Sequence, residues 1–274
     1  MSENKLEQFP IKKFVKTKND LRAIILGFTG SGKTEFGKIL LREYQKSKKR
    51  NIIVMDTKYE FDHIKKFESK NVMSQGLLRR IRGIKVRGNI YENPIDVCEY
   101  ASALAWYWKP SILYVEEIPN IVSRAENLPS SHKNLYKVIQ QGRSKSIGFV
   151  CASQKINQLN KQLLDESTDI FIFALIPSAC RKLEESLELP KGSLKFNLPD
   201  ELELGKPLEK LSSKERKDLY SFYRITKSGS IKQYAPLPIK KFMKAQDLYE
   251  NQIESEEKKK ELELKQGKKV IIDV

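Results

Sequence analysis

The sequence has little of the residue types on which disulfide scaffolds and metal sites depend. It contains three cysteines and two histidines in 274 residues. Cys98, Cys151 and Cys180 are odd in number and far apart, so they predict neither a disulfide framework nor a zinc site. A reducing compartment is the simplest expectation for such a chain. His63 and His132 are isolated from other metal-binding side chains in the sequence, and neither is assigned a role.

Long apolar runs are also missing. The longest, residues 170–177 (IFIFALIP), is well short of the roughly 20 residues that a membrane-spanning helix needs. The first ten residues, MSENKLEQFP, lack the charged-then-apolar pattern of a signal peptide. We therefore expect no membrane span and a cytoplasmic protein. Hydrophobic residues make up 39% of the chain, which is enough for a sizeable core and too much for an intrinsically disordered chain.

Positive charge is in clear excess. The chain has 51 Lys and Arg against 35 Asp and Glu, for a formal net charge of +16. Such an excess predicts a polyanionic partner, either nucleic acid or an anionic membrane surface. The alternative is a solvated, lysine-rich surface of the kind found in thermophile proteins. The excess is locally dense in residues 64–88, which hold eight basic residues and one acidic residue.

Compact β-branched runs alternate with amphipathic segments. Near-continuous apolar runs are typical of parallel strands buried on both faces, and they predict strands at 23–26, 51–55, 112–115, 147–152 and 169–175. Helical spacing predicts helices at 36–44, 93–108, 132–141 and 160–166. This alternation indicates an α/β fold with a mainly parallel sheet flanked by helices. Residues 221–235 predict a small hairpin turning at Ser228 and Gly229, and the chain beyond residue 239 predicts a charged helix.

Residues 27–34 read GFTGSGKT and match the phosphate-binding pattern G-x-x-x-x-G-K-[ST] between a predicted strand and a predicted helix. Glycines allow the backbone torsions that turn successive N–H groups inward around phosphates, and the helix start adds partial positive charge. Lys33 is expected to reach the β- and γ-phosphates, and the Thr34 hydroxyl to bind Mg²⁺. The motif therefore predicts binding of ATP with Mg²⁺ by Gly27, Thr29, Gly30, Ser31, Gly32, Lys33 and Thr34.

Two acidic residues, Glu116 and Glu117, follow the predicted strand 112–115. A carboxylate at the end of a neighbouring strand is what a P-loop enzyme needs to hold the magnesium shell, and we expect Glu116 to do so. Glu117 is then expected to polarise the attacking water. The alternative is a buried strand that simply ends in polar residues. The first residue of such a pair is ordinarily Asp, and Glu is one methylene longer.

Three further segments carry a family resemblance. Asp56 and Lys58 form a D-x-K pattern after the second strand, residues 142–148 (GRSKSIG) resemble a G-R-x-x-G segment, and Ser153-Gln154 ends the fourth strand. In this order, after the phosphate loop and the acidic strand end, they resemble the FtsK–HerA superfamily of P-loop ATPases over residues 20–185. The resemblance implies a RecA-like sheet, a hexameric ring and ATP-driven pumping of double-stranded DNA through its pore.

The resemblance also implies roles for two residues. Arg143 resembles the family's arginine finger, which reaches the γ-phosphate bound by the neighbouring subunit; a surface arginine at a helix end is the alternative. Gln154 resembles the polar sensor at the tip of the strand beside the P-loop strand, the alternative being an ordinary turn residue. The basic stretch 64–88 is expected to contact DNA phosphates in the pore, or to be a solvated basic helix.

Compact members of this superfamily without a membrane anchor look most like viral genome-packaging ATPases. The expected function is thus an ATP-driven double-stranded DNA translocase, with a capsid or portal-like protein as a further partner and the host cytoplasm or the virion as its location. A HerA-type or conjugative coupling motor is the nearest alternative, and an ATP-dependent binding switch is the second. The expected organisation is a lead-in segment at 1–20, a RecA-like ATPase domain at 21–240 and a charged helix or tail at 241–274.

Overall fold

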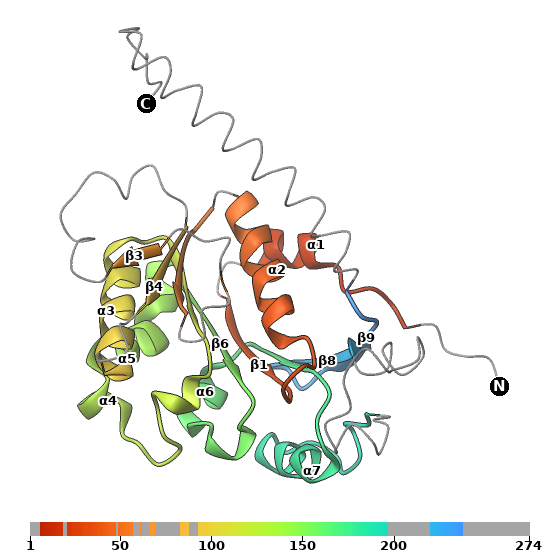
Figure 1. Cartoon of the computed structure of the whole chain (residues 1–274). Coiled ribbons are helices and arrows are strands. Elements are labelled where there is room, and N and C mark those ends of the chain that lie inside the picture. The colour runs from red at the N-terminus through yellow and green to blue at the C-terminus, as the bar shows by residue number, and fades with distance from the viewer. Residues whose placement is uncertain are drawn as a thin grey trace, which may run out of the picture. The chain divides into compact units, whose positions relative to one another are not determined.

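In the described part of the chain, nine strands form a central sheet with the order β3-β4-β2-β5-β6-β1-β7-β8-β9 (Figure 1). The computed structural model describes residues 6–18, 21–47, 49–56, 61, 66–68, 83–87, 93–196 and 220–237. The strands are β1 (Arg22–Leu26), β2 (Asn51–Met55), β3 (Lys66–Glu68), β4 (Gly83–Arg87), β5 (Ser111–Val115), β6 (Ile147–Ser153), β7 (Asp169–Ile172), β8 (Phe222–Thr226) and β9 (Ile231–Tyr234). The pairs from β3 to β7 are all parallel, and β8 and β9 add antiparallel strands at one edge.

The expectation of a mainly parallel sheet flanked by helices is confirmed. β2 has the predicted bounds, and β1, β5 and β6 extend their predicted ranges by one residue. The strand predicted at 169–175 is wrong at its end, because β7 stops at Ile172. Beyond that point the backbone contacts the last residue of β1 and the loop after it: the Phe173 N–H donates to the Leu26 carbonyl at 2.7 Å, and the Phe28 N–H donates to the Ala174 carbonyl at 3.1 Å.

The helices are α1 (Ile11–Thr17), α2 (Lys33–Lys46), α3 (Pro94–Tyr107), α4 (Leu128–Ser131), α5 (Lys133–Gln141), α6 (Lys161–Glu166) and α7 (Pro177–Ser186). Asn93 caps α3 as predicted, since its side chain accepts the Ile95 N–H at 3.0 Å with Pro94 in the first helical turn. Asn160 caps α6 in the same way. The helices α1, α4 and α7 and the strands β3 and β4 were not predicted. Within the described part of the chain, no helix is long and apolar enough to cross a membrane.

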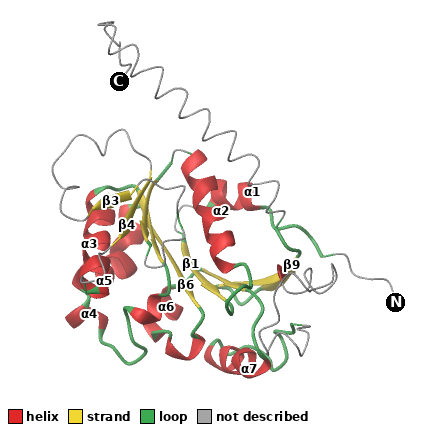
Figure 2. Ribbon diagram, in the orientation of Figure 1, coloured by secondary structure: helices red, strands yellow, loops and turns green. Residues whose placement is uncertain are grey.

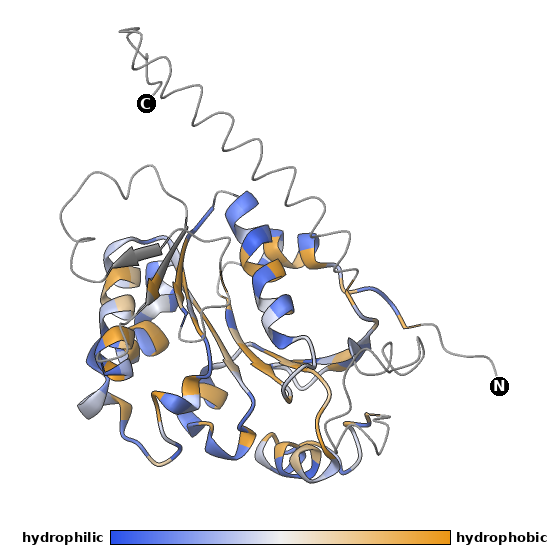
Figure 3. Ribbon diagram, viewed as in Figure 1, coloured by the Kyte–Doolittle hydropathy of each residue, from blue (hydrophilic) through white to orange (hydrophobic). Residues whose placement is uncertain are grey.

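Helices cover both faces of the sheet. α1 and α2 lie on one face, and α3 and α5 lie on the other (Figure 2). The central strands are buried along their whole length, and Figure 3 shows their apolar residues in the middle of the fold. Because side chains alternate along a strand, β5 directs Leu113 and Val115 toward the core beneath α3 and α5. Tyr114 therefore points to the other face, where its hydroxyl lies against Gly37 of α2.

The hairpin predicted at 221–235 is confirmed: β8 and β9 pair across a turn in which Gly229 has a φ of 78°. Its first strand helps to enclose an aromatic cluster that also involves α1 and α2. Rings from separate elements pack with centroid distances of 4.6–6.2 Å, as seen for Phe9, Phe14, Phe36, Phe171 and Phe222. The residues before β1 are therefore anchored to the core by aromatic packing. The charged helix predicted beyond residue 239 lies outside the described residues.

A buried carboxylate ties the same elements together by charge. Asp169 at the start of β7 is fully buried, and it accepts hydrogen bonds from Lys18 at 2.9 Å and from Arg224 Nε at 2.8 Å. The Arg224 guanidinium also lies 4.9 Å from the Phe14 ring centroid. A carboxylate in this position needs its cationic partners, because an uncompensated buried charge is strongly destabilising. The network thereby joins the segment after α1 to β7 and β8.

We predict that Asp169→Asn lowers the free energy of unfolding by about 2 kcal/mol, the usual scale for hydrogen bonds to a charged group. The amide keeps the shape of the side chain but cannot balance two cations. Urea denaturation followed by circular dichroism measures the loss. Glu35→Gln is the matched control, because Glu35 pairs with Lys38 at 2.7 Å on the surface of α2, where an ion pair contributes about 0.5 kcal/mol. Equal shifts in both variants would contradict the structural role given to Asp169.

Candidate functional site

The loops after three parallel strands meet at one edge of the sheet. β6 lies between β1 and β5 and pairs with both, so the loops that follow these strands emerge side by side. The predicted phosphate loop follows β1, the predicted acidic pair follows β5, and Gln154 follows β6. The carboxyl ends of parallel strands are where α/β proteins place their ligands. The structure thus brings together most of the residues that the sequence singled out.

The phosphate loop, residues 27–34, has the backbone that its glycines predict. Gly30 and Gly32 have φ angles of 80° and 96°, in the left-handed region that residues with a Cβ rarely adopt. At Gly27 the space is closed as well, since a Cβ there would lie 2.5 Å from Ser31 Oγ and 2.8 Å from Phe173 Cβ. The loop then enters α2 directly, with Gly32 at the N-cap.

Two side chains of this loop can donate hydrogen bonds to a bound anion. The buried Lys33 ammonium donates to the Phe28 carbonyl at 2.8 Å, which holds the cation against the loop. The Ser31 hydroxyl is fully buried and has no hydrogen-bond partner among the described residues. A buried polar atom without a partner is unusual, and a phosphate oxygen in the loop would satisfy it. The residues present therefore fit a bound nucleoside triphosphate.

Glu116 links the acidic strand end to the phosphate loop. Its carboxylate is buried, and Oε1 accepts a hydrogen bond from Thr34 Oγ1 at 3.3 Å. The other oxygen, Oε2, accepts the Tyr114 hydroxyl at 2.6 Å. A hydroxyl and a carboxylate this close form an oxygen pair of the kind that Mg²⁺ prefers when it is bound together with phosphates. The predicted metal ligands, Thr34 and Glu116, thus lie within hydrogen-bond distance of each other.

Glu117 is held differently from Glu116. It has a φ of 49°, a left-handed conformation that is uncommon for a residue with a side chain, and a short 3₁₀ turn (Ile118–Asn120) follows it. Its buried carboxylate accepts the backbone N–H of Gln154 at 3.0 Å. The Gln154 side chain in turn accepts the Thr29 hydroxyl at 2.7 Å. Gln154 therefore connects the predicted base to the phosphate loop.

Arg143 lies apart from these residues. It belongs to a 3₁₀ turn (Gly142–Lys145) that precedes β6, and its side chain is exposed. Gln154, by contrast, directly follows β6. The seven residues of β6 place the two ends of this strand about 20 Å apart, at 3.3 Å per residue. Within one chain, Arg143 therefore lies at the end of the sheet where the parallel strands begin, and the phosphate loop lies at the end where they finish.

Other residues singled out by the sequence are Asp56, Lys58, the basic stretch 64–88 and the aromatic residues at the end of α3. Asp56 is buried after β2, and its carboxylate accepts the Phe61 N–H at 3.2 Å. Lys58 and most of the basic stretch 64–88 lie outside the described residues. At the end of α3, Trp106 and Trp108 pack partly against the core, whereas Tyr107 is 76% exposed.

The cysteines do not contribute nucleophiles. All three are free and buried. Burial raises the pKa of the Cys98 thiol to about 12, and it also raises the pKa of Cys151. A thiol with such a pKa is hardly ionised at neutral pH, and the thiolate is the reactive form. His132 is likewise buried, with its Nε2 atom 2.9 Å from a carboxylate oxygen of Glu126.

The sequence reasoning missed Tyr114 and Gly37. Tyr114 comes two positions before Glu116 on β5, so the two side chains share a face of the sheet. That spacing is a local signal, and it could have predicted that the tyrosine hydroxyl reaches the carboxylate. Gly37 gives a weaker signal: a glycine inside an amphipathic helix usually has a packing reason.

The fold and this site define a P-loop NTPase in which one strand lies between the P-loop strand and the acidic strand. The sequence model of the central domain of the helicase HerA matches residues 22–274, and the chain belongs to this family within the FtsK–HerA superfamily. No curated protein sequence matches the chain.

Solved structures with the same fold include a viral protein bound to a nucleotide analogue. The genome-packaging NTPase B204 from Sulfolobus turreted icosahedral virus 2, in complex with AMPPCP, is 14% identical, with a TM-score of 0.57 over 80% of this chain and 99% of that one. The DNA-packaging ATPase B204 from Sulfolobus turreted icosahedral virus is 16% identical, with a TM-score of 0.56 over 80% and 98% of the two chains. At these identities the likeness shows the fold.

Proposed function

We propose that this protein is an ATP-driven translocase of double-stranded DNA, and that it serves as a genome-packaging motor of a virus. The observation that carries the proposal is the meeting of Lys33, Glu116 and Glu117 at one sheet edge in a member of the HerA central-domain family. A net charge of +16 supports a polyanionic partner. The packaging role is proposed by analogy with the B204 packaging enzymes, which share this fold, and a cellular or conjugative motor is the alternative.

The phosphate loop does the binding in this proposal. The N–H groups at the start of α2 and the Lys33 ammonium would hold the β- and γ-phosphates, and Ser31 would donate its unpartnered hydroxyl to a phosphate oxygen. Thr34 and Glu116 would hold Mg²⁺, which neutralises charge on the phosphates when bound. Bound in this way, the nucleotide would be held at the end of the sheet where the loops after β5 and β6 also lie.

Glu117 and Gln154 supply the chemistry of hydrolysis. Glu117 would orient a water molecule and take its proton as the water oxygen attacks the γ-phosphorus. The bond between the γ-phosphorus and the oxygen that bridges it to the β-phosphate would break, and ADP would leave with the electron pair. The bond from Gln154 N–H fixes the carboxylate, and the Gln154 amide lies beside the loop, where it can sense whether a γ-phosphate is present. A simple binding switch would not need a catalytic base, so the presence of Glu117 beside the phosphate loop favours turnover.

Arg143 completes the site from a neighbouring subunit. A planar, permanently charged guanidinium suits the oxygens of a transferring phosphoryl group. Because Arg143 lies at the other end of β6 from the phosphate loop, it would act on a nucleotide held by another copy of the chain. A ring, which we propose to be hexameric, supplies such a neighbour at every site. Basic residues of the stretch 64–88 would track the DNA phosphates without reading bases.

We predict that long double-stranded DNA stimulates ATP hydrolysis by the purified chain, and that the stimulation falls steeply as salt rises. Counterion release makes phosphate contacts salt-dependent. A coupled phosphate-release assay with and without DNA measures the effect. Lys33→Ala, which removes the phosphate-binding ammonium, is the negative control and should abolish hydrolysis. Hydrolysis that is indifferent to DNA at every salt concentration would contradict the motor.

We predict that Glu117→Gln binds ATP with nearly wild-type affinity but hydrolyses it at least about a hundredfold more slowly, because the amide cannot take a proton. Equilibrium binding of radiolabelled ATP and single-turnover hydrolysis separate the two effects. The matched control is Glu126→Gln, which changes a carboxylate that contacts His132 outside the site. Normal turnover in Glu117→Gln would show that another group is the base.

Action between subunits predicts a specific pattern for Arg143→Ala. Mixing Arg143→Ala chains with Glu117→Gln chains, each inactive alone, should restore part of the activity. Some interfaces in a mixed ring then combine an intact arginine with an intact base. Phosphate release measured across mixing ratios checks this, and Lys145→Ala, two positions away, serves as the control. A complete lack of activity at all ratios would contradict a finger supplied in trans.

A further inference from the structure

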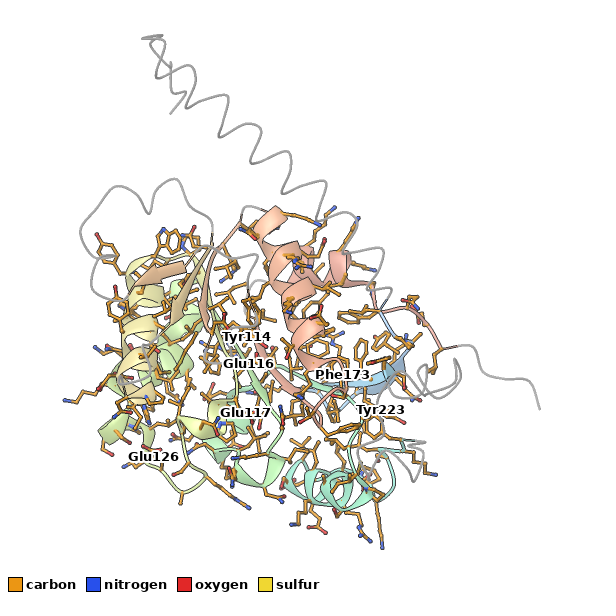
Figure 4. The ribbon with its side chains drawn as sticks, viewed as in Figure 1. Tyr114, Glu116, Glu117, Glu126, Phe173 and Tyr223 are labelled. Atoms are coloured by element: carbon orange, nitrogen blue, oxygen red, sulfur yellow. The ribbon has the colours of Figure 1, made fainter. Side chains whose placement is uncertain are left out.

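The hydroxyl of Tyr114 contacts the carboxylate that stands where this class of site ordinarily has the shorter Asp. Tyr114 is fully buried on β5, and it donates to Glu116 Oε2 at 2.6 Å. The opposite oxygen of the same carboxylate accepts the Thr34 hydroxyl at 3.3 Å. Figure 4 labels Tyr114 and Glu116 beside each other in the middle of the fold. Both oxygens of Glu116 are therefore directed by hydroxyl groups.

Gly37 makes room for this tyrosine on the facing helix. A Cβ at position 37 would lie 2.7 Å from the Tyr114 hydroxyl oxygen and 3.0 Å from Cε2, distances that force a displacement. Gly37 is buried inside α2, and glycine is among the weakest helix formers. A glycine in this position needs a packing reason, and the end of the tyrosine ring supplies one.

The ring is held from another side as well. Phe61 is buried, and its ring centroid lies 5.0 Å from that of Tyr114. The Phe61 backbone N–H is itself held by the Asp56 carboxylate at 3.2 Å. Tyr114 is thus confined between α2 and the Phe61 ring, with little freedom to turn its hydroxyl away from Glu116.

We propose that Tyr114 is a positioning residue for magnesium: its hydroxyl holds the long Glu116 side chain in the one orientation that leaves Oε1 facing Thr34. The proposal rests on the function proposed above, in which Thr34 and Glu116 hold Mg²⁺ with the nucleotide. Groups that hydrogen-bond to a metal-binding carboxylate orient it, and their removal commonly costs about tenfold or more in metal affinity. The extra methylene of Glu makes such a restraint necessary, because it adds a rotatable bond.

The test is the coupling between Mg²⁺ and nucleotide, measured as the affinity of the full chain for AMPPCP in Mg²⁺ divided by its affinity in EDTA. Isothermal titration calorimetry gives both values without hydrolysis. Tyr114→Phe should lower this ratio about tenfold while leaving the EDTA affinity unchanged. Tyr44→Phe is the matched control, since this buried tyrosine of α2 donates to the Lys18 carbonyl away from the site.

Two further variants separate positioning from general stability. In a Glu116→Gln background, Tyr114→Phe should cause little further loss of the ratio, because the hydroxyl acts through that carboxylate. Gly37→Ala, which displaces the ring end, should lower the ratio in the same way as Tyr114→Phe. Thermal unfolding of each variant confirms that the folded chain is compared.

The outcomes distinguish this inference from the proposed function. If Glu116→Gln lowers the ratio and Tyr114→Phe does not, the positioning role is wrong and the nucleotide site stands. Equal losses for Tyr114→Phe in Mg²⁺ and in EDTA would also overturn it, since they indicate a structural effect. If the wild-type chain does not bind AMPPCP, or if Glu116→Gln leaves the ratio unchanged, the proposed magnesium site fails and the positioning role fails with it.

Discussion

The parallel alignment of β1, β6 and β5 is the constraint on which the rest of the site depends. Neighbouring strands lie about 4.8 Å apart, so the loops after β1 and β5 are separated by about 10 Å with β6 between them. Polar groups on the outer two loops must bridge that distance. Gln154 directly follows the middle strand and makes both connections: its side chain accepts a hydrogen bond from the Thr29 hydroxyl, and its backbone N–H donates one to the Glu117 carboxylate.

Glu116 is one methylene longer than the Asp that ordinarily occupies this position. Its carboxylate reaches from the end of β5 to the first turn of α2, where it accepts the Thr34 hydroxyl. A longer side chain loses more conformational freedom when it is held in one orientation, and a fixed hydrogen-bond partner helps to hold it there. The tyrosine two residues earlier on the strand is placed to be that partner.

Several residues with left-handed backbone lie at this end of the sheet, whereas the aromatic and charged anchors of the fold lie elsewhere. The glycine torsions of the phosphate loop and the left-handed Glu117 all follow the carboxyl ends of strands. The aromatic cluster around Phe9 and the buried Asp169 network tie α1, β7 and β8 together instead. Such a division is common, because unfavourable conformations persist only where the surrounding structure determines them. Arg143 lies at the opposite end of β6, in the exposed turn that precedes this strand.

The sequence by itself determined the phosphate loop, the five parallel strands around it, the cap at Asn93 and the C-terminal hairpin, because these signals are local. Glycine spacing, apolar runs and capping residues act over a few positions. Tertiary structure alone decided that β7 ends at Ile172, since the two residues after it hydrogen-bond to Leu26 at the end of β1 and to Phe28 in the following loop. It also decided that α1 packs on the core, that β3 and β4 extend the sheet, and that Gln154 holds Glu117. Those contacts join residues far apart in the chain, and their formation depends on strand order, which no short pattern specifies.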